Sequence, residues 1–190
     1  MRFVLSTVHE DAPVRIVGGK HAGRDLTSPK DFRVRPTAEH VRAGIMGMVG
    51  DFKDARVLDL FAGTGALGLE AMSRGAKAAD FVETRPSSLH ALKANIGLLR
   101  MSDRTRVFKR DALPYAENLP ANSYDIAFVD PPYESKMLDR VIARWLAVPF
   151  ARILVAEHAS THVLPKGNQT QSFDETVVTI YRAVRPTTAP

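Results

Sequence analysis

The chain has 190 residues, of which 45% are hydrophobic and 25% are charged, and these are ordinary values for a domain that folds around its own core. It contains no cysteine, which excludes disulfides, thiolate metal sites and cysteine nucleophiles, and no apolar segment approaches the ~20 residues of a membrane span. We therefore expect a cytoplasmic protein without membrane contact, and its formal net charge of +5 favours a polyanionic partner such as nucleic acid.

The N-terminal part of the sequence predicts a basic hairpin followed by a helix. Residues 15–26 are typical of two short strands around a glycine-containing turn, in a region where basic residues outnumber acidic ones. Apolar residues then recur at helical spacing over residues 38–49, with Thr37 in the position of a helix N-cap. Gly44 and Gly47 weaken this helix, so we expect it to be held by packing or to need the close approach of another backbone.

From residue 56 onward, strand-like and helix-like segments alternate. The predicted strands are 56–61, 79–83, 105–109, 124–129 and 152–157, and the predicted helices are 66–74, 86–100 and 135–147. Alternation of this kind indicates a parallel sheet with helices on both faces. The pattern stops after residue 157, where a polar loop at 165–172 precedes a final strand at 175–183 that has no room for a helical crossover and is therefore expected to be antiparallel.

These elements predict an α/β fold with a doubly wound, Rossmann-like sheet, whose last strand is antiparallel, and a small N-terminal β-hairpin. We expect seven strands in the sheet, one more than the six located above. We divide the chain into an N-terminal extension with the hairpin at 1–34, a main domain at 35–185 and a tail at 186–190. The main domain is expected to carry the chemistry, because the glycine-rich and acidic segments described next all lie within it.

A glycine loop follows the first strand of the alternating region. Gly63, Gly65 and Gly68 open the next helix, which is the context in which such a loop brings its backbone close to a ligand. Glu83 ends the following strand, where a carboxylate can accept hydrogen bonds from both hydroxyls of a ribose. Loop and acid together indicate a cofactor that contains adenosine. A nicotinamide dehydrogenase would show the same two features and is one alternative.

Three further acidic positions favour S-adenosylmethionine over a dinucleotide. Asp59 lies inside the strand before the loop, where it suits an α-amino group, although it could instead be a structural acid that bonds backbone amides. Asp111 follows the third strand and is positioned to accept from an adenine amino group. The tetrapeptide 130–133, Asp-Pro-Pro-Tyr, follows the fourth strand, and its two prolines make the chain leave the sheet in a stiff conformation. S-adenosylmethionine has an amine, a ribose and an adenine but no pyrophosphate.

The sequence also resembles a known family. Residues 57–71 and 130–133, with Glu83, look like the class I S-adenosylmethionine-dependent methyltransferases. More narrowly, residues 15–19, 35–37 and 41–42 resemble the RsmD family of bacterial enzymes that methylate guanine N2 in 16S ribosomal RNA. The resemblance implies a Rossmann-like methyltransferase sheet, S-adenosylmethionine as cofactor, and 16S ribosomal RNA or the small ribosomal subunit as partner. Apart from the resemblance, we expect a monomeric enzyme without a metal.

The resemblance also implies roles for individual residues. The implied catalytic residues are Asp130, Pro131, Pro132 and Tyr133: the Asp130 carboxylate and the Pro131 carbonyl would accept from the target amine, and Tyr133 would stack on the base. The implied cofactor-binding residues are Arg35, Thr37, Asp59, Phe61, Ala62, Gly63, Gly65, Glu83, Asp111 and Ala112. The implied RNA contacts are Arg15, Lys20, Arg24 and Arg33. The histidines show no metal-ligand spacing, so we predict no metal site.

Two alternative functions stay open at the level of the sequence. A DNA adenine-N6 methyltransferase could use the same tetrapeptide 130–133, but the chain shows no obvious insertion for reading a major groove. An RNA-binding protein could retain the cofactor fold without turnover, but the intact tetrapeptide argues against this alternative. Methylation of a pyrimidine carbon through a covalent cysteine adduct is excluded, because the chain has no cysteine.

Overall fold

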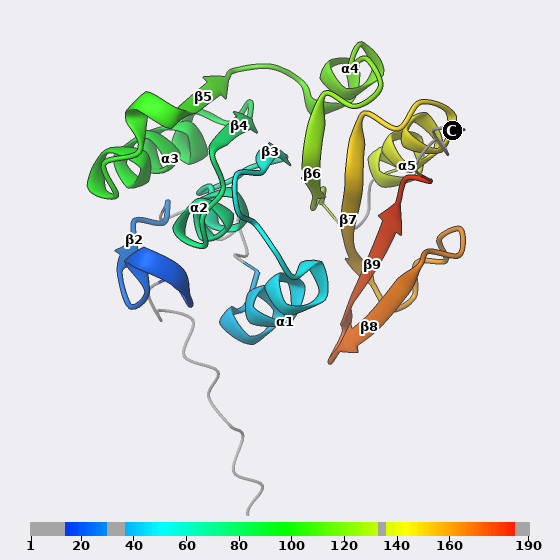
Figure 1. Ribbon diagram of the computed structural model, residues 1–190, viewed down its shortest axis with the longest axis horizontal. Coiled ribbons are helices and arrows are strands. Elements are labelled where there is room, and N and C mark those ends of the chain that lie inside the picture. Colours follow the sequence, from blue (N-terminus) through cyan, green and yellow to red (C-terminus); the bar gives the residue numbers. More distant parts are fainter. Residues whose placement is uncertain (1–13, 30–36, 133–135, 185–190) are drawn as a thin grey trace, which may run out of the picture.

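A seven-stranded mixed sheet forms the centre of the computed structural model, which describes residues 14–29, 37–132 and 136–184 (Figure 1). Its strands are β3 (Arg56–Leu60), β4 (Ala78–Val82), β5 (Thr105–Phe108), β6 (Tyr124–Val129), β7 (Ala151–Ala159), β8 (Gln169–Phe173) and β9 (Thr176–Arg182). They lie in the order β5-β4-β3-β6-β7-β9-β8, and β9 pairs antiparallel with both of its neighbours. The chain builds outward from β3 in one direction and then returns to build β6 on the other side. Ligands of open α/β sheets bind at such a switch point, outside the carboxyl ends of the strands.

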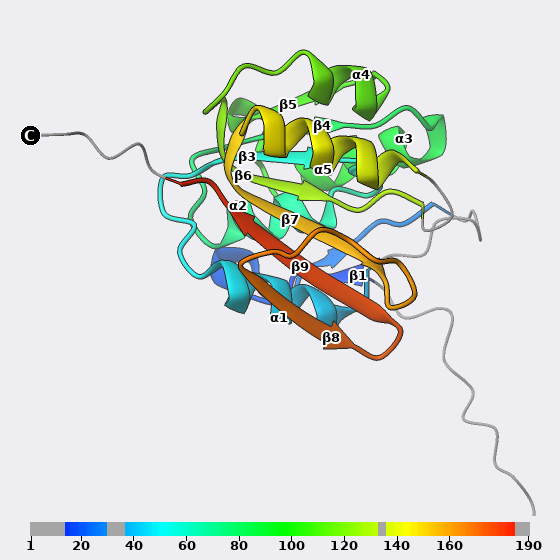
Figure 2. The same ribbon diagram turned by 90° about the vertical axis from the view of Figure 1, so that its right-hand side faces the viewer.

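Helices cover both faces of the sheet (Figures 1 and 2). One face packs against α1 (Glu39–Val49), α2 (Ala66–Ser73) and α3 (Pro86–Leu98), and the other packs against α4 (Ala112–Glu117) and α5 (Met137–Ala147). Side chains of neighbouring strand residues alternate between these two cores: Phe128 belongs to the first and Val129 to the second. The central strands are therefore buried on both faces, which explains why they read as continuous apolar runs in the sequence.

The N-terminal hairpin consists of β1 (Val14–Arg15) and β2 (Asp25–Leu26), joined through a short 3-10 turn. It is fastened to α2 by a buried glutamate, because both carboxylate oxygens of Glu70 accept backbone hydrogen bonds, from Val17 N and Gly18 N, at 2.7 Å each. Ser73 Oγ of the same helix accepts from His21 N at 2.9 Å. Hydrogen bonds to several backbone amides thus hold the hairpin against α2, so the backbone that carries its basic side chains has a fixed position.

The predicted fold is confirmed, including the seven strands, the antiparallel last strand and the hairpin. The predicted polar loop at 165–172 is wrong in its second half, because residues 169–173 form the edge strand β8. Four of its five residues are exposed and polar, so the strand carries no apolar alternation and is specified by its pairing with β9. The short helix α4 was not predicted, since its six residues offer less than two turns of periodicity.

Two details of α1 also bear on the sequence analysis. The prediction of Thr37 as N-cap is wrong, because Ala38 occupies that position and makes no side-chain cap. The expected packing is confirmed at Gly44, where an added Cβ would lie 2.2 Å from the side-chain ring of Phe173 in β8. Gly47 has open space around it, so no close approach explains that glycine.

Candidate active site

Three acidic side chains lie in one row across the carboxyl edge of the sheet. The strand register places Val82, Leu60, Val129 and Ala156 side by side in β4, β3, β6 and β7. The next residue along each of these parallel strands is Glu83, Phe61, Asp130 or Glu157. The glycine loop, the acid Glu83 and the acid Asp130, which are separated in the sequence, are therefore brought to the same edge, at the switch point of the sheet.

The glycine loop after β3 is a strained turn with one open position. Phe61 adopts a φ of 62°, in the left-handed region that favours glycine, and Gly63 and Gly65 follow with φ of 54° and 82°. A Cβ added to Gly65 would lie 2.4 Å from Leu92 Cδ1, so this glycine packs against the protein. A Cβ added to Gly63 would meet no atom nearer than the Phe61 carbonyl oxygen at 4.0 Å. The loop is packed from behind and is open at Gly63, where a ligand could approach its backbone.

Glu83 and Asp59 both hold the backbone of this loop. One oxygen of Glu83 accepts from Gly63 N at 2.9 Å, and the other accepts from Thr84 N and Arg85 N. Asp59 is buried and accepts from Gly68 N, also at 2.9 Å, in the first turn of α2. This bond agrees with the interpretation of Asp59 as an acid that bonds backbone amides, and its role toward an amine stays a prediction.

The protonation of Asp59 follows from its surroundings. Burial raises the pKa of its carboxyl to about 8, the Gly68 N–H opposes the rise, and the charge of Glu83 adds to it. Burial therefore favours the protonated form of Asp59 in the isolated protein. A cationic group placed beside it would reverse this preference, because a nearby positive charge favours the ionised form.

Asp111 and Ala112 lie beyond the end of β5, at the same edge of the sheet. Asp111 is exposed and caps α4, its Oδ1 accepting from Leu113 N at 3.1 Å, while Ala112 is buried. The cap fixes the Asp111 carboxylate at the start of the helix. The structure thus brings it to the edge occupied by Glu83, and contact with an adenine stays a prediction.

Asp130 is linked to a second carboxylate through one hydroxyl. Thr37 Oγ1 lies 3.3 Å from Asp130 Oδ2 and 3.1 Å from Glu157 Oε2. Burial and then the neighbouring Glu157 charge raise the pKa of Asp130 well above its usual range, and the Thr37 hydroxyl opposes this rise. The main chain at Thr37 is itself held, since the buried Arg42 donates to its carbonyl oxygen and to that of Arg15. Thr37 therefore lies beside the candidate catalytic acid.

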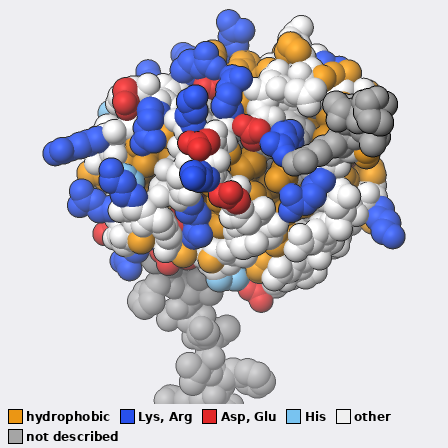
Figure 3. Space-filling model, viewed as in Figure 1, with side chains coloured by type: hydrophobic (Ala, Val, Ile, Leu, Met, Phe, Trp, Pro, Cys, Tyr) orange, Lys and Arg blue, Asp and Glu red, His pale blue; other side chains and the backbone are white. Residues whose placement is uncertain are grey.

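Some of the predicted residues lie outside the described part of the chain, namely Arg33, Arg35 and Tyr133. Of the predicted RNA contacts, Lys20 and Arg24 are exposed on the hairpin, and Arg15 forms a 3.0 Å ion pair with Asp25. Figure 3 shows Lys and Arg side chains gathered over the half of this face that carries the hairpin, α3 and β5, with a few acidic groups among them. A positive surface of this kind suits a polyanion.

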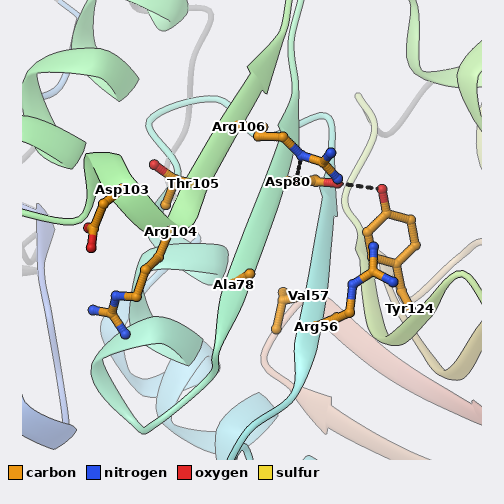
Figure 4. Close-up of a pocket in the computed structure, with 9 residues that line it drawn as sticks. All are labelled: Arg56, Val57, Ala78, Asp80, Asp103, Arg104, Thr105, Arg106 and Tyr124. Carbon is orange, nitrogen blue, oxygen red and sulfur yellow. Dashed lines mark hydrogen bonds and ion pairs between the residues drawn. The ribbon is translucent and has the colours of Figure 1, made fainter.

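A hollow of about 170 Å³ lies at the opposite, amino edge of the sheet (Figure 4). Within it, Arg106 donates to both oxygens of Asp80, which also accepts from the Tyr124 hydroxyl at 2.7 Å, and Arg56 lies over the Tyr124 ring. These charged groups interact with one another at the edge of the sheet opposite the glycine loop. We therefore assign the residues of the hollow a structural role and not a role in ligand binding. No group of metal-ligating side chains occurs among the described residues.

Sequence reasoning missed four polar residues that organise the site and the hairpin: Arg42, Glu70, Asn95 and Glu157. Asn95 is buried in α3 and bonds both Thr27 and the Thr64 carbonyl, which ties the chain after the hairpin to the glycine loop. The position of Glu157 was open to prediction. It follows an apolar run in a parallel strand, as Asp130 does, and the same rule places both at one edge.

Comparison with known proteins gives a consistent result. The family model described as conserved hypothetical protein 95 matches residues 14–179. YlbH of Bacillus subtilis, provisionally named an rRNA methyltransferase, is 32% identical over 80% of this chain and 86% of its own length. Ribosomal RNA small subunit methyltransferase D of Escherichia coli is 35% identical over 68% of this chain and 65% of its own length. The solved structure of yhhF from Escherichia coli, provisionally named a methyltransferase, has a TM-score of 0.76 at 28% identity and covers 90% of this chain and 98% of its own. Within the described ranges, none of the helices has the length and apolar character needed to cross a membrane.

Proposed function

The chain belongs to the RsmD family, and from this premise we propose that it transfers a methyl group from S-adenosylmethionine to the exocyclic N2 of a guanine in 16S ribosomal RNA. The observation that carries the proposal is the row that sets Asp130, with its two prolines, beside the glycine loop and Glu83. A carboxylate that can accept hydrogen bonds from an amine lies at the same sheet edge as residues that suit an adenosine. This combination suits methyl transfer to an amino group.

The residues present fit this cofactor. The open side of Gly63 allows a ligand to approach the loop backbone, and Glu83 and Asp111 lie at the same edge for the ribose and the adenine. Phe61, Ala62 and Gly65 complete the loop around the methionine part, with Asp59 toward its amine and Thr37 and Arg35 toward its carboxylate. Bound there, S-adenosylmethionine supplies a methyl group that its sulfonium ion already activates.

Positioning is the main contribution of the protein. The lone pair of a guanine N2 is delocalised into the ring, so the amine needs to be turned toward the methyl group. Hydrogen bonds from its protons to the Asp130 carboxylate and the Pro131 carbonyl fix the nitrogen, and Pro132 makes the corner stiff. Tyr133 stacks on the base, which has to be unpaired or flipped out to reach this edge. Lys20, Arg24 and Arg33 hold the RNA backbone beside it, and Arg15 contributes when Asp25 releases it.

The experiment offers radiolabelled S-adenosylmethionine with four acceptors: small ribosomal subunits lacking methylation, naked 16S RNA, total DNA and no nucleic acid. Label in 16S RNA, alone or within the subunit, supports the proposal. Label in DNA would replace it with the adenine-N6 alternative. Tight cofactor binding with no label in any acceptor would favour an RNA-binding protein without turnover. Calorimetry with S-adenosylmethionine and with a nicotinamide dinucleotide, run in parallel, tests the dehydrogenase alternative directly.

A further inference from the structure

The hydroxyl of Thr37 lies between two carboxylates and carries one proton. It is within hydrogen-bonding distance of Asp130 Oδ2 and of Glu157 Oε2, at 3.3 and 3.1 Å, so it can donate to one of them at a time. When Asp130 is ionised, the hydroxyl can donate to it. When Asp130 carries a proton, Asp130 can donate to the hydroxyl oxygen, and the hydroxyl can turn to Glu157. The three groups thus form a chain with two proton arrangements.

The surroundings favour one retained proton on this chain. Glu157 is buried in β7, and Asp130 is partly buried at the end of β6, so two ionised carboxylates here would repel each other with little water between them. When it is ionised, Asp59 of β3 also disfavours the ionised form of Asp130, while the Thr37 hydroxyl and Arg85 after β4 favour that form. The buried Arg42 of α1 interacts electrostatically with Glu157, as it does more strongly with Glu70 and Glu39. Burial and the neighbouring Glu157 charge thus both favour the protonated form of Asp130, which faces the substrate in the proposed function.

We propose that Glu157 is a positioning residue that, through Thr37, sets the pH range in which Asp130 is able to take a proton from the target amine. The inference rests on the proposed function and adds a residue to it. When the nitrogen–carbon bond forms and the carbon–sulfur bond breaks, the electron pair of that bond stays on sulfur and the nitrogen becomes cationic. One N–H proton then passes to the Asp130 carboxylate, which leaves a neutral methylated amine. The Glu157 charge makes Asp130 a stronger acceptor for that proton, since a proton relieves the repulsion between the two acids.

The first test is the pH profile of kcat at saturating RNA and cofactor. Turnover of the wild type rises with pH as Asp130 ionises. Glu157→Gln removes the repelling charge and moves this acidic limb about one pH unit lower, while Thr37→Val removes the hydroxyl that favours ionised Asp130 and moves the limb higher. Thr37→Ser keeps the hydroxyl and returns the limb toward the wild-type position. Glu175→Gln, which removes an exposed carboxylate of the β8–β9 turn, leaves the limb in place.

The second test uses the protein without cofactor or RNA. A folded-state acid with a raised pKa makes the unfolding free energy fall as pH rises, so the wild type loses stability as pH rises above the ordinary aspartate pKa of about 4. Glu157→Gln should flatten this fall and Glu175→Gln should not, as measured by urea unfolding. Circular dichroism at pH 5 checks that both variants fold.

The outcomes separate the two ideas. Suppose that Glu157→Gln, Thr37→Val and the wild type are all active and that kcat falls at the same acidic pH in all three. This result would overturn the inference and leave the proposed function intact. A wild type that methylates no RNA would remove the proposed function and with it the role of Glu157 in the reaction. Equal pH slopes of unfolding in Glu157→Gln and Glu175→Gln would refute the coupling of the two acids as well.

Discussion

Three glycines with similar backbone angles allow the cofactor site to be tested apart from folding. Gly63, Gly65 and Gly23 have φ of 54°, 82° and 81°, so an alanine at any of them pays the same left-handed conformational penalty of about 1 kcal/mol. Their surroundings differ. An added Cβ has open space at Gly63 and Gly23 but lies 2.4 Å from Leu92 Cδ1 at Gly65.

The expected stabilities follow from these contacts. Gly63→Ala and Gly23→Ala should each lower the free energy of unfolding by about 1 kcal/mol. Gly65→Ala adds a clash in a closely packed region and should lower it by about 2–4 kcal/mol in total. Urea unfolding of the three variants and the wild type, at one pH and temperature, measures the differences.

Cofactor affinity should follow a different order. The Gly63 methyl group fills the open side of the loop, so we expect binding of S-adenosylmethionine to weaken at least tenfold, by about 1.4 kcal/mol or more. Gly23 lies in the hairpin, and its alanine variant should bind as the wild type does. Calorimetry decides the matter: wild-type affinity in Gly63→Ala, or equal weakening in Gly23→Ala, would refute the assignment of the loop.

Three further predictions concern single groups. Asp59→Asn should flatten the pH dependence of stability, because the raised pKa of about 8 means that the wild type loses unfolding free energy as pH rises from about 4 toward 8. If urea unfolding gives the same dependence of unfolding free energy on pH for the variant and the wild type, the assigned burial effect is contradicted. Glu70→Ala should leave the Val17 and Gly18 amides without their acceptor and destabilise the hairpin by about 2–4 kcal/mol, seen as faster hydrogen exchange there; unchanged exchange would show that Glu70 does not fasten it. Lys20→Ala and Arg24→Ala should each reduce the salt dependence of RNA binding by about one phosphate contact while cofactor affinity stays constant, and an unchanged salt slope would remove the hairpin from the RNA interface.

The alternating strands and helices, and the sheet edge that carries the site residues, could be predicted because they depend on local signals. Apolar runs in the sequence indicate the strands. Glu83 and Asp130 each follow such a run, and the carboxyl ends of parallel strands lie at one edge of the sheet, so the two acids lie at the same edge. The edge strand β8 could not be read in this way, since its residues are polar and only pairing with β9 makes them a strand.

The polar contacts around the site depend on tertiary structure. Thr37 has the residue type of an N-cap, but its hydroxyl reaches Asp130 and Glu157, which are 93 and 120 residues away in the chain. Glu70 looks like an ordinary helix residue, and only the docked hairpin explains why it is buried. Side chains that bond across long sequence separations carry no periodic signal, so their roles emerge only from the fold.

The most direct test of the central claim is nucleoside analysis of 16S RNA after reaction with the wild type and with Asp130→Ala. We predict N2-methylguanosine in the wild-type reaction and its loss in the variant, with cofactor affinity largely retained, because the role proposed for Asp130 is to hold the amine and not the cofactor. Undiminished methylation by Asp130→Ala, or a wild-type product that is N6-methyladenine in DNA, would contradict the account.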